Sequence, residues 1–172
     1  GNLHNFGGRI NQHGDLRLLA SNQYRGVQEQ YSNVCGSGLF MEGIEQNPVY
    51  YDLAFEMPLH RDSIEIIKWL SRYTERRYGS KSEKAEAAWT CLLEGPYRPG
   101  TNGTERSSII AARPALNVKK SGPNAGLGIP YSPLLVIKAA GLLLEDADKL
   151  KKSEAYRFDI MDVQRQMMTN LG

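Results

Sequence analysis

The sequence has few cysteines and almost no excess charge, and each shortage excludes a class of protein. Its 172 residues include only Cys35 and Cys91, too few for a disulfide scaffold or a four-thiolate zinc site. Lysine and arginine total 21 against 19 aspartates and glutamates, a net charge of +2. A nucleic-acid-binding protein normally carries a strong basic patch. No nucleic-acid partner is therefore expected.

Long hydrophobic runs are also missing. The most apolar stretch, residues 133–144, is interrupted by Lys138 and is too short to cross a bilayer, so no membrane partner is expected. Residues 1–8 lack the basic start and apolar run of a signal peptide. Hydrophobic residues make up 41% and charged residues 23%, values that are typical of a globular protein.

Motifs for nucleotides and metal ions are absent as well. The Gly-Ser-Gly of residues 36–38 resembles the start of a dinucleotide loop, but Met41 stands where the third glycine is needed. The three histidines, His4, His13 and His60, are too scattered along the sequence to suggest a shared metal ion. We therefore predict neither a metal site nor an organic cofactor.

The residues that are present divide the chain near position 62. Residues 62–172 predict helices with one long interruption over 96–130, and a loop of that length in a compact domain is often functional. Residues 1–61 predict two strand–helix units. The expected elements are a strand ending near residue 6, a weak helix over 10–20, a strand around 33–40 and a helix over 48–57.

Capping residues predict where the helices begin. Asn47-Pro48 predicts one start, because asparagine is a good N-cap and proline suits the first helical position. Asp62-Ser63-Ile64-Glu65 has the pattern of a capping box, and Ser80-Lys81-Ser82-Glu83 predicts the next start. Two more helices are expected over 131–151 and 154–171.

Aromatic and basic residues in the helical part have ordinary structural interpretations. Trp69, Tyr73 and Trp89 recur at the spacing of a buried helical face, which favours core packing over sugar stacking. Arg76 and Arg77 are expected on a solvated face or as partners of carboxylates. Neither group indicates a binding site.

Glu42 is the most informative residue for function. It follows an apolar strand and precedes a helix start, and in a parallel β/α barrel that strand end faces the catalytic mouth. His4 and Phe6 end the preceding strand on the same face, and a carboxylate, an imidazole and an aromatic ring suit a sugar site. Position alone slightly favours a structural role, as a helix cap or a partner of Arg9. Glu45 follows on the same turn, so it is expected to be solvated or structural, because glycosidase carboxylates flank the scissile bond from separate strands.

Several segments resemble one known family. Leu3-His4-Asn5-Phe6-Gly7-Gly8 and Met41-Glu42-Gly43-Ile44-Glu45-Gln46-Asn47 are similar to paired strand motifs of the α-N-acetylglucosaminidases, glycoside hydrolase family 89. The resemblance covers almost the whole chain. The other segments in the family's order are Arg76–Gly79, Ala87–Trp89, Ala112–Leu116 and Tyr156–Asp162.

The resemblance implies an α/β part followed by an all-α part. Residues 1–61 would form the last two β/α units of a (β/α)8 barrel, and residues 62–172 the first portion of an α-helical C-terminal domain. The family resembles retaining exo-glycosidases that release terminal α-linked N-acetylglucosamine from glycans. Two β/α units leave open sheet edges, so the chain is expected to be a fragment that is inactive alone. Its expected partners are the glycan substrate and the remainder of the same polypeptide.

The resemblance also implies roles for residues at the two strand ends. Glu42 would be the catalytic nucleophile, and Phe6 would line the sugar pocket. His4 and Asn5 would support that pocket as further substrate-binding residues. The family's acid/base glutamate lies on an earlier strand, and nothing in this sequence matches that region.

Two departures from the family pattern lie in or beside the long loop. Glu105 stands where human-type members carry a histidine, and Tyr131 lies where they have an Ile-Trp-Tyr stretch. Both are expected to contribute to substrate binding. The same loop carries Arg113, and part of it is expected to return to the barrel mouth and form a wall near Glu42.

Two other functions remain open from the sequence. One is a non-catalytic helical interaction module, and the other is a sugar-binding module that has lost hydrolysis. The paired strand-end motifs favour the glycosidase, because a helical adaptor does not need them. The sequence does not fix the compartment; a family-like protein would be secreted, periplasmic, or lysosomal or vacuolar.

Overall fold

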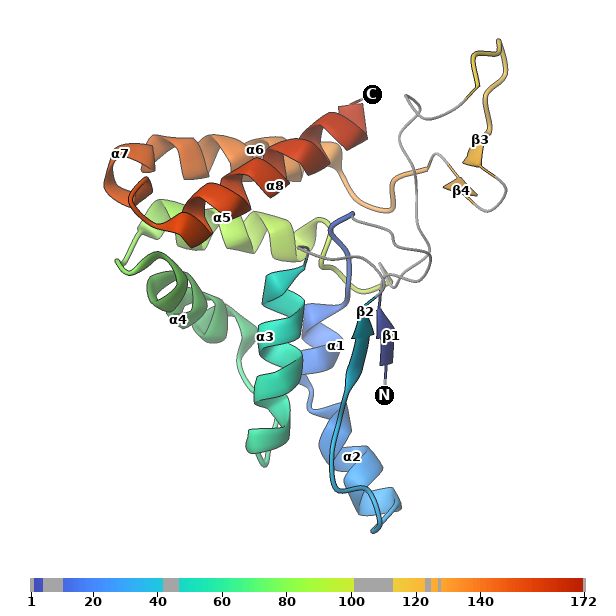
Figure 1. Ribbon diagram of the computed structural model, residues 1–172, viewed down its shortest axis with the longest axis vertical. Helices are drawn as coiled ribbons and strands as arrows, with labels where there is room; N and C mark the ends of the chain where they lie inside the picture. The colour runs from blue at the N-terminus through green and yellow to red at the C-terminus, as the bar shows by residue number, and fades with distance from the viewer. Residues whose placement is uncertain are drawn as a thin grey trace.

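A computed structural model describes residues 2–4, 11–41, 47–100, 113–122, 125–126 and 128–171, and helices dominate it (Figure 1). Its first elements are β1 (Asn2–His4), α1 (Leu16–Ala20), α2 (Gln23–Gln30), β2 (Leu39–Met41), α3 (Pro48–Glu56) and the 3-10 turn η1 (Met57–Leu59). The later elements are α4 (Ile66–Tyr78), α5 (Glu83–Glu94), β3 (Lys120–Gly122), β4 (Ala125–Gly126), α6 (Pro133–Glu145), α7 (Ala147–Leu150) and α8 (Glu154–Leu171).

The N-terminal part contains a parallel strand pair. β1 and β2 run side by side with His4 opposite Met41, and α1 and α2 lie in the connection between them. Parallel strands need such a crossover, which is usually helical. α3 follows β2, so the order of elements is strand, helices, strand, helix. The described residues therefore contain a β/α arrangement of the kind that the sequence predicts.

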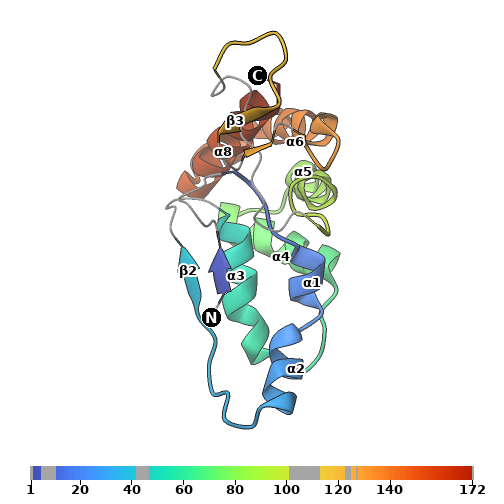
Figure 2. The ribbon, with the colours of Figure 1, turned by 90° about the vertical axis from the view of Figure 1, so that its right-hand side faces the viewer.

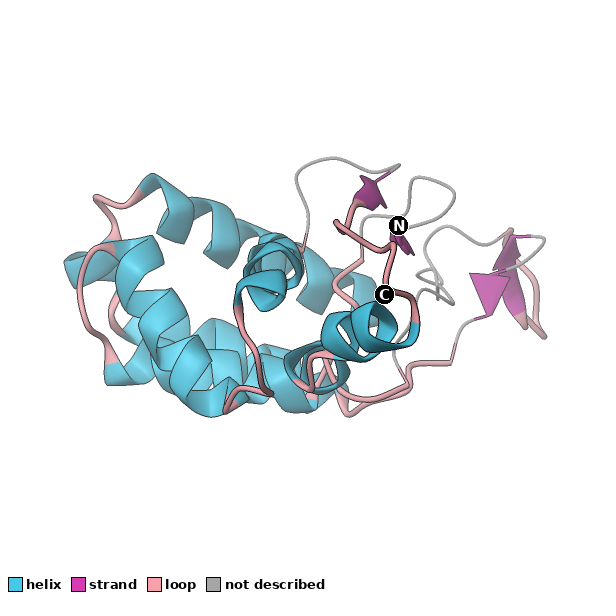
Figure 3. Ribbon diagram, turned by 90° about the horizontal axis from the view of Figure 1, so that it is seen from below, coloured by secondary structure: helices cyan, strands magenta, loops and turns pink. Residues whose placement is uncertain are grey.

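The helical part packs in layers against this unit. α5 packs on α6, α6 on α8, and α4 contacts both α5 and α8 (Figure 1). α1 contacts both α3 and α4, so the strand–helix part is joined to the helical layers through helices. Figure 3 shows the short strands to one side of the helical body.

One hydrophobic core extends through both parts. Trp69 stacks on Tyr73, Tyr73 meets Trp89 edge to face, and Trp89 stacks on Tyr97, with ring centroids 5.1, 5.3 and 6.3 Å apart. These four rings are at most 2% exposed, which confirms the expected core role of Trp69, Tyr73 and Trp89. The same cluster includes residues of α1, α3, α5, α6 and α8, among them Leu16, Leu53, Leu92, Leu143 and Val163.

A buried ion pair joins α4 to α8. Arg77 donates from Nε and Nη2 to the two carboxylate oxygens of Asp159, at 2.6 and 2.7 Å. Tyr78 donates to the same carboxylate at 2.9 Å and accepts from the indole N–H of Trp89, also at 2.9 Å. Burial raises the pKa of Asp159, and the hydrogen bonds from Arg77 and Tyr78 act in the opposite direction. The neighbouring Arg76 reaches Asp52, so both arginines have carboxylate partners, as the sequence indicated.

Several predicted helix boundaries were wrong in the first part of the chain. The helix expected over 10–20 is confined to α1, which starts after the N-cap Asp15. The polar stretch before β2 contains the helix α2. None of its residues is buried, so its sequence lacks the apolar periodicity that would have predicted a helix. The second strand is shorter than expected. The capping box at Asp62 does not form: the N–H of Ile64 donates to the carbonyl of Ala20, and α4 begins only at Ile66, after the extended Glu65.

Other boundaries agree with the sequence or depart by a few residues. Ser82 caps α5 through its hydroxyl, which accepts from the Ala85 N–H at 2.9 Å, so the helix starts later than Ser80. The helix expected over 131–151 is divided at Asp146 into α6 and α7. The long loop contains the antiparallel pair β3–β4, which the sequence did not predict. Within the described residues, no helix has the length and apolar character needed to span a membrane.

Candidate active site

The ends of β1 and β2 define the candidate site. Because the strands are parallel and in register, both carboxyl ends lie at the same edge, where His4 ends β1 beside Met41 of β2. Glu42 is the next residue in the sequence after Met41, and Asn5 follows His4. The predicted site residues Asn5, Phe6, Glu42 and Glu105 lie outside the described residues, whereas His4 and Tyr131 lie within them.

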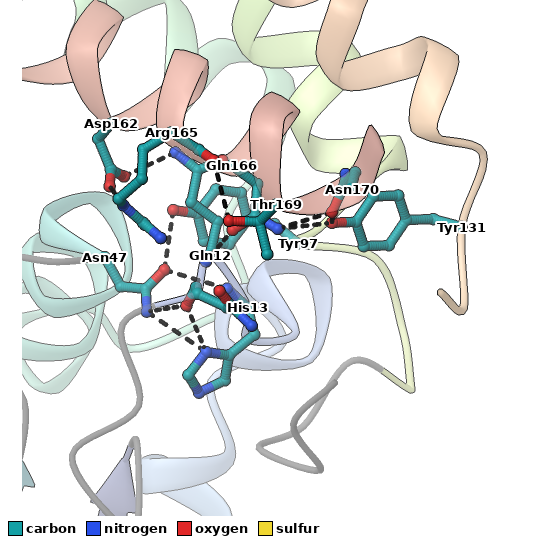
Figure 4. Close-up of polar contacts among 11 residues, drawn as sticks. Gln12, His13, Asn47, Tyr97, Tyr131, Asp162, Arg165, Gln166, Thr169 and Asn170 are labelled. Carbon is teal, nitrogen blue, oxygen red and sulfur yellow. Dashed lines mark hydrogen bonds and ion pairs between the residues drawn. The ribbon is translucent and has the colours of Figure 1, made fainter. Parts of the chain in front are cut away.

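Asn47 joins the segments that follow the two strands. Its side chain is fully buried, and its backbone is in the left-handed region with φ 47° and ψ 40°. The side-chain oxygen accepts from the backbone N–H of His13 at 3.1 Å and from the Tyr97 hydroxyl at 2.9 Å (Figure 4). The side-chain nitrogen donates to the carbonyl of Asn11 at 3.2 Å. One amide therefore joins the start of α3 to residues 11 and 13, which precede α1, and to Tyr97, three residues after the end of α5.

The expected side-chain cap at Asn47 is not formed. Asn47 is the N-cap residue of α3, and its backbone carbonyl accepts from the N–H groups of Tyr50 and Tyr51. Its side chain makes no cap hydrogen bond, because the amide is turned toward His13 and Tyr97 instead. The residue that begins the helix thus uses its side chain for long-range contacts.

Among the described residues, His13 is the only histidine in contact with Asn47. Its ring is 8% exposed, and Nδ1 lies 2.8 Å from the carbonyl of Asn11 and 3.5 Å from the side-chain nitrogen of Asn47. A carbonyl can only accept, so Nδ1 carries the proton toward Asn11. The ring therefore holds the backbone carbonyl of Asn11, two residues before it.

Gln12 makes the second link to the helical part. Its backbone N–H donates to the side-chain oxygen of Gln166 at 2.8 Å, and its side-chain nitrogen donates to Asp162 at 2.8 Å. Arg165 donates from Nη2 to the other carboxylate oxygen of Asp162, Oδ1, at 2.6 Å. We call the residues that make these contacts the polar junction: Gln12, His13, Asn47, Tyr97, Asp162 and Gln166. It links the segments after both strands to α8 and to the residues that follow α5 (Figure 4).

Tyr131 lies at the edge of this junction. Its hydroxyl accepts from the side-chain nitrogens of Gln166 and Asn170, each at 3.2 Å. Burial raises the pKa of this hydroxyl, while the bonds from Asn170 and Gln166 act against that rise. The hydroxyl is therefore held by α8, and the partly buried ring packs against the hydrophobic core.

The described part of the long loop lies beyond the strand ends. β3 and β4 are found on the side toward which β1 and β2 point in two perpendicular views (Figures 1 and 2). Arg98 donates to the carbonyl of Pro130 at 3.1 Å, which joins the two ends of the loop. Arg113 is exposed, and within the described ranges it forms no ion pair.

Sequence reasoning missed most of the polar junction. The sequence indicates Asn47 only as a helix cap, and His13 only as one of three scattered histidines. Gln12 and Gln166 are 154 residues apart, and no periodicity relates them. Among the described residues, no three His, Cys, Asp or Glu side chains gather in a way that would hold a metal ion.

Comparison with known proteins first defines the class. Residues 1–61 match the family model "Alpha-N-acetylglucosaminidase (NAGLU) tim-barrel domain", and residues 69–172 match the model of the NAGLU C-terminal domain. The class is therefore that of glycoside hydrolases with a barrel domain followed by a C-terminal domain. The chain belongs to the α-N-acetylglucosaminidase family, which confirms the resemblance seen in the sequence.

Relatives of known structure and function support this family assignment. Human α-N-acetylglucosaminidase is 33% identical over 173 residues, which are 98% of this chain and 22% of the human protein. A family 89 glycoside hydrolase from Clostridium perfringens in complex with 2-acetamido-1,2-dideoxynojirmycin superposes with a TM-score of 0.85 at 31% identity. A Clostridium perfringens variant with two Glu→Gln substitutions, in complex with its substrate GlcNAc-α-1,4-galactose, gives 0.88 at 30% identity. Each match covers 98% of this chain and 19% of the solved one, so the chain spans about a fifth of its relatives.

Proposed function

We propose that this chain contributes the nucleophile of a retaining glycosidase that releases terminal, non-reducing α-linked N-acetylglucosamine from glycans. Support comes from the human relative, which is an α-N-acetylglucosaminidase, and from the bacterial relative that binds GlcNAc-α-1,4-galactose as its substrate. The described residues match those relatives in both sequence and backbone. Binding of a terminal N-acetylglucosamine is the corresponding proposal for this chain's partner.

The proposed domain map follows from the order of elements. Residues 1–61 form the last two β/α units of a (β/α)8 barrel, and residues 62–172 form the first portion of the helical domain. The parallel pair β1–β2 with its helical crossover supports the first assignment. The packing of α4, α5, α6 and α8 on one another supports the second.

One observation carries the catalytic proposal: His4 lies in register with Met41, and Glu42 is the next residue in the chain. In a barrel, residues that follow the carboxyl ends of strands form the active site. A carboxylate after one strand and the His4-Asn5-Phe6 motif at the end of its neighbour suit a pocket for a pyranose ring.

The proposed mechanism is a double displacement. The ionised carboxylate of Glu42 attacks the anomeric carbon while an acid on the opposite side gives its proton to the departing glycosidic oxygen. Water, deprotonated by that same second group, then attacks the anomeric carbon and releases the sugar and the Glu42 carboxylate. The second carboxyl is proposed to come from a residue outside this chain. The N-terminus of α3, which begins six residues after Glu42, favours a nearby negative charge and so helps keep the nucleophile ionised.

Other residues are proposed to shape the pocket. Phe6 packs on the sugar ring, with His4 and Asn5 supporting it from the strand end. Glu105 supplies a polar contact from the long loop. Tyr131 is proposed to contact the substrate with the part of its ring that the core leaves exposed, since its hydroxyl is bonded to α8. The β3–β4 region lies beyond the strand ends, which supports the proposal that the long loop forms one wall of the pocket (Figure 2).

Glu42→Gln in the full-length enzyme tests this function, with Glu45→Gln as the matched control. Glutamine keeps the shape of the side chain but lacks the nucleophilic oxygen. We expect the kcat of Glu42→Gln for an aryl α-N-acetylglucosaminide to fall by several orders of magnitude, with substrate binding changed far less. Glu45→Gln should retain turnover close to that of the wild type. Near-normal turnover in Glu42→Gln contradicts the proposal, and so does a wild-type protein that binds the sugar without hydrolysing it.

A further inference from the structure

Two buried asparagines have left-handed backbones. Asn22 and Asn47 have φ values of 60° and 47°, and no other described residue apart from glycine has a positive φ. Such a conformation costs free energy for any residue with a side chain, although asparagine tolerates it better than most. Each residue is the N-cap of a helix, yet neither uses its side chain as a cap. Both side chains instead make long-range hydrogen bonds.

The contacts of Asn47 converge from three parts of the chain. The amide accepts from the His13 N–H and the Tyr97 hydroxyl and donates to the Asn11 carbonyl, all within 3.2 Å. It is fully buried, so water does not compete for these bonds. Asn11 and His13 belong to the segment after β1, which begins with the His4-Asn5-Phe6 motif. Asn47 ends the segment after β2, which begins with Glu42.

We propose that Asn47 is a positioning residue for the nucleophile, an inference that rests on the proposed function of Glu42. Its amide joins the N-cap of α3, five residues after Glu42, to the backbone of Asn11 and His13, and in this proposal that anchor sets the position of the carboxylate. Tyr97 extends this support to the helical domain, because its ring lies in the core and its hydroxyl reaches the amide. A displacement of about 1 Å at a reacting group can cost about 10²-fold in rate.

A glycine substitution tests the side-chain contacts of Asn47 separately from its left-handed backbone conformation. Asn47→Gly permits the left-handed conformation without strain but removes every side-chain contact. Asn22→Gly does the same at a matched position. The Asn22 side-chain nitrogen donates to the carbonyls of His60 and Asp62, at 3.0 and 3.3 Å. Those contacts join the α1–α2 turn to the segment after η1 and involve neither strand end.

The experiment compares the two glycine variants in the full-length enzyme. For Asn47→Gly we expect kcat to fall about 10²-fold with KM nearly unchanged, and the rate of covalent trapping by a slow fluorinated N-acetylglucosaminyl substrate to fall in parallel. For Asn22→Gly we expect kcat within about twofold of the wild type, even where thermal unfolding shows a similar loss of stability. All rates are measured well below the unfolding temperature of the less stable variant.

Tyr97→Phe provides a second variant that keeps the core ring and removes one hydrogen bond to Asn47. We expect kcat to fall about fivefold, the effect of one neutral hydrogen bond, again with KM unchanged. Wild-type kcat in both Asn47→Gly and Tyr97→Phe overturns the proposal. An equal fall in kcat for Asn47→Gly and Asn22→Gly overturns it too, because a general loss of structure would then explain both.

The same trapping experiment separates this inference from the proposed function. If the wild-type enzyme is labelled on Glu42 and Asn47→Gly is labelled at the same rate, the positioning role is wrong and the nucleophile stands. If the wild-type label falls on another residue, the proposed nucleophile is wrong and the positioning role is overturned with it.

Discussion

Removing Arg77 should destabilise the protein far more than removing the arginine beside it. The Arg77 side chain is 19% exposed, and its partner Asp159 is 3% exposed. Arg76 is 56% exposed and meets the half-exposed Asp52 at 3.5 Å. Arg77→Met keeps most of the buried aliphatic stem but leaves a carboxylate in the core without its cation. Breaking a buried pair in this way costs about 3–5 kcal/mol, whereas an exposed pair is worth about 0–1 kcal/mol.

Urea unfolding of Arg77→Met and Arg76→Met at pH 7 measures this difference directly. The double variant Arg77→Met with Asp159→Asn should recover part of the loss, because the amide carries no charge and still accepts from Tyr78. Without Arg77, burial leaves the folded-state pKa of Asp159 above its unfolded value. The destabilisation of Arg77→Met should therefore shrink as the pH falls toward about 4, where the unfolded chain also binds the proton. Equal costs for the two arginine variants, or no recovery in the double variant, would show that the buried pair contributes no more to stability than the exposed one.

Two further stability predictions concern a carboxylate and a helix cap. Although burial raises the pKa of Glu56, nearby hydrogen-bond donors and the Arg76 charge lower it below its ordinary value of 4.5. Glu56→Gln should therefore reduce the free energy of unfolding at pH 7, and urea titrations should show the deficit vanishing as the pH falls below 4.5; a deficit independent of pH contradicts this. Ser82→Ala removes the cap of α5 and a 2.6 Å hydrogen bond to Asp146, and should cost about 1 kcal/mol in the same assay. Thr90→Ala, at an exposed position within α5, is its control and should change stability by less than about 0.5 kcal/mol.

The arrangement of the strand ends was predictable because local pattern determines it. An apolar run, a glycine turn and an Asn-Pro helix start are short-range signals, and parallel strands bring their carboxyl ends to one edge. The pairing of His4 with Met41 agrees with these signals, and the place of Glu42 beside them stays a prediction. The core residues Trp69, Tyr73 and Trp89 were predictable for a similar reason, since helical spacing places them on one face.

The polar junction was not predictable, because its contacts join residues distant in the sequence. Asn47 is a standard helix cap by sequence, and only the folded chain turns its amide toward His13 and Tyr97. The start of α4 was misplaced for a related reason. The N–H of Ile64 donates to the carbonyl of Ala20 in a tertiary hydrogen bond, and α4 begins only after the extended Glu65.

The most direct test of the account is to identify the residue that becomes covalently attached to the sugar. Full-length enzyme is incubated with a slow fluorinated N-acetylglucosaminyl substrate, digested, and the labelled peptide is sequenced by mass spectrometry. We expect an ester on Glu42, and no label in the Glu42→Gln variant. A label on Glu45, or on any residue other than Glu42, contradicts it.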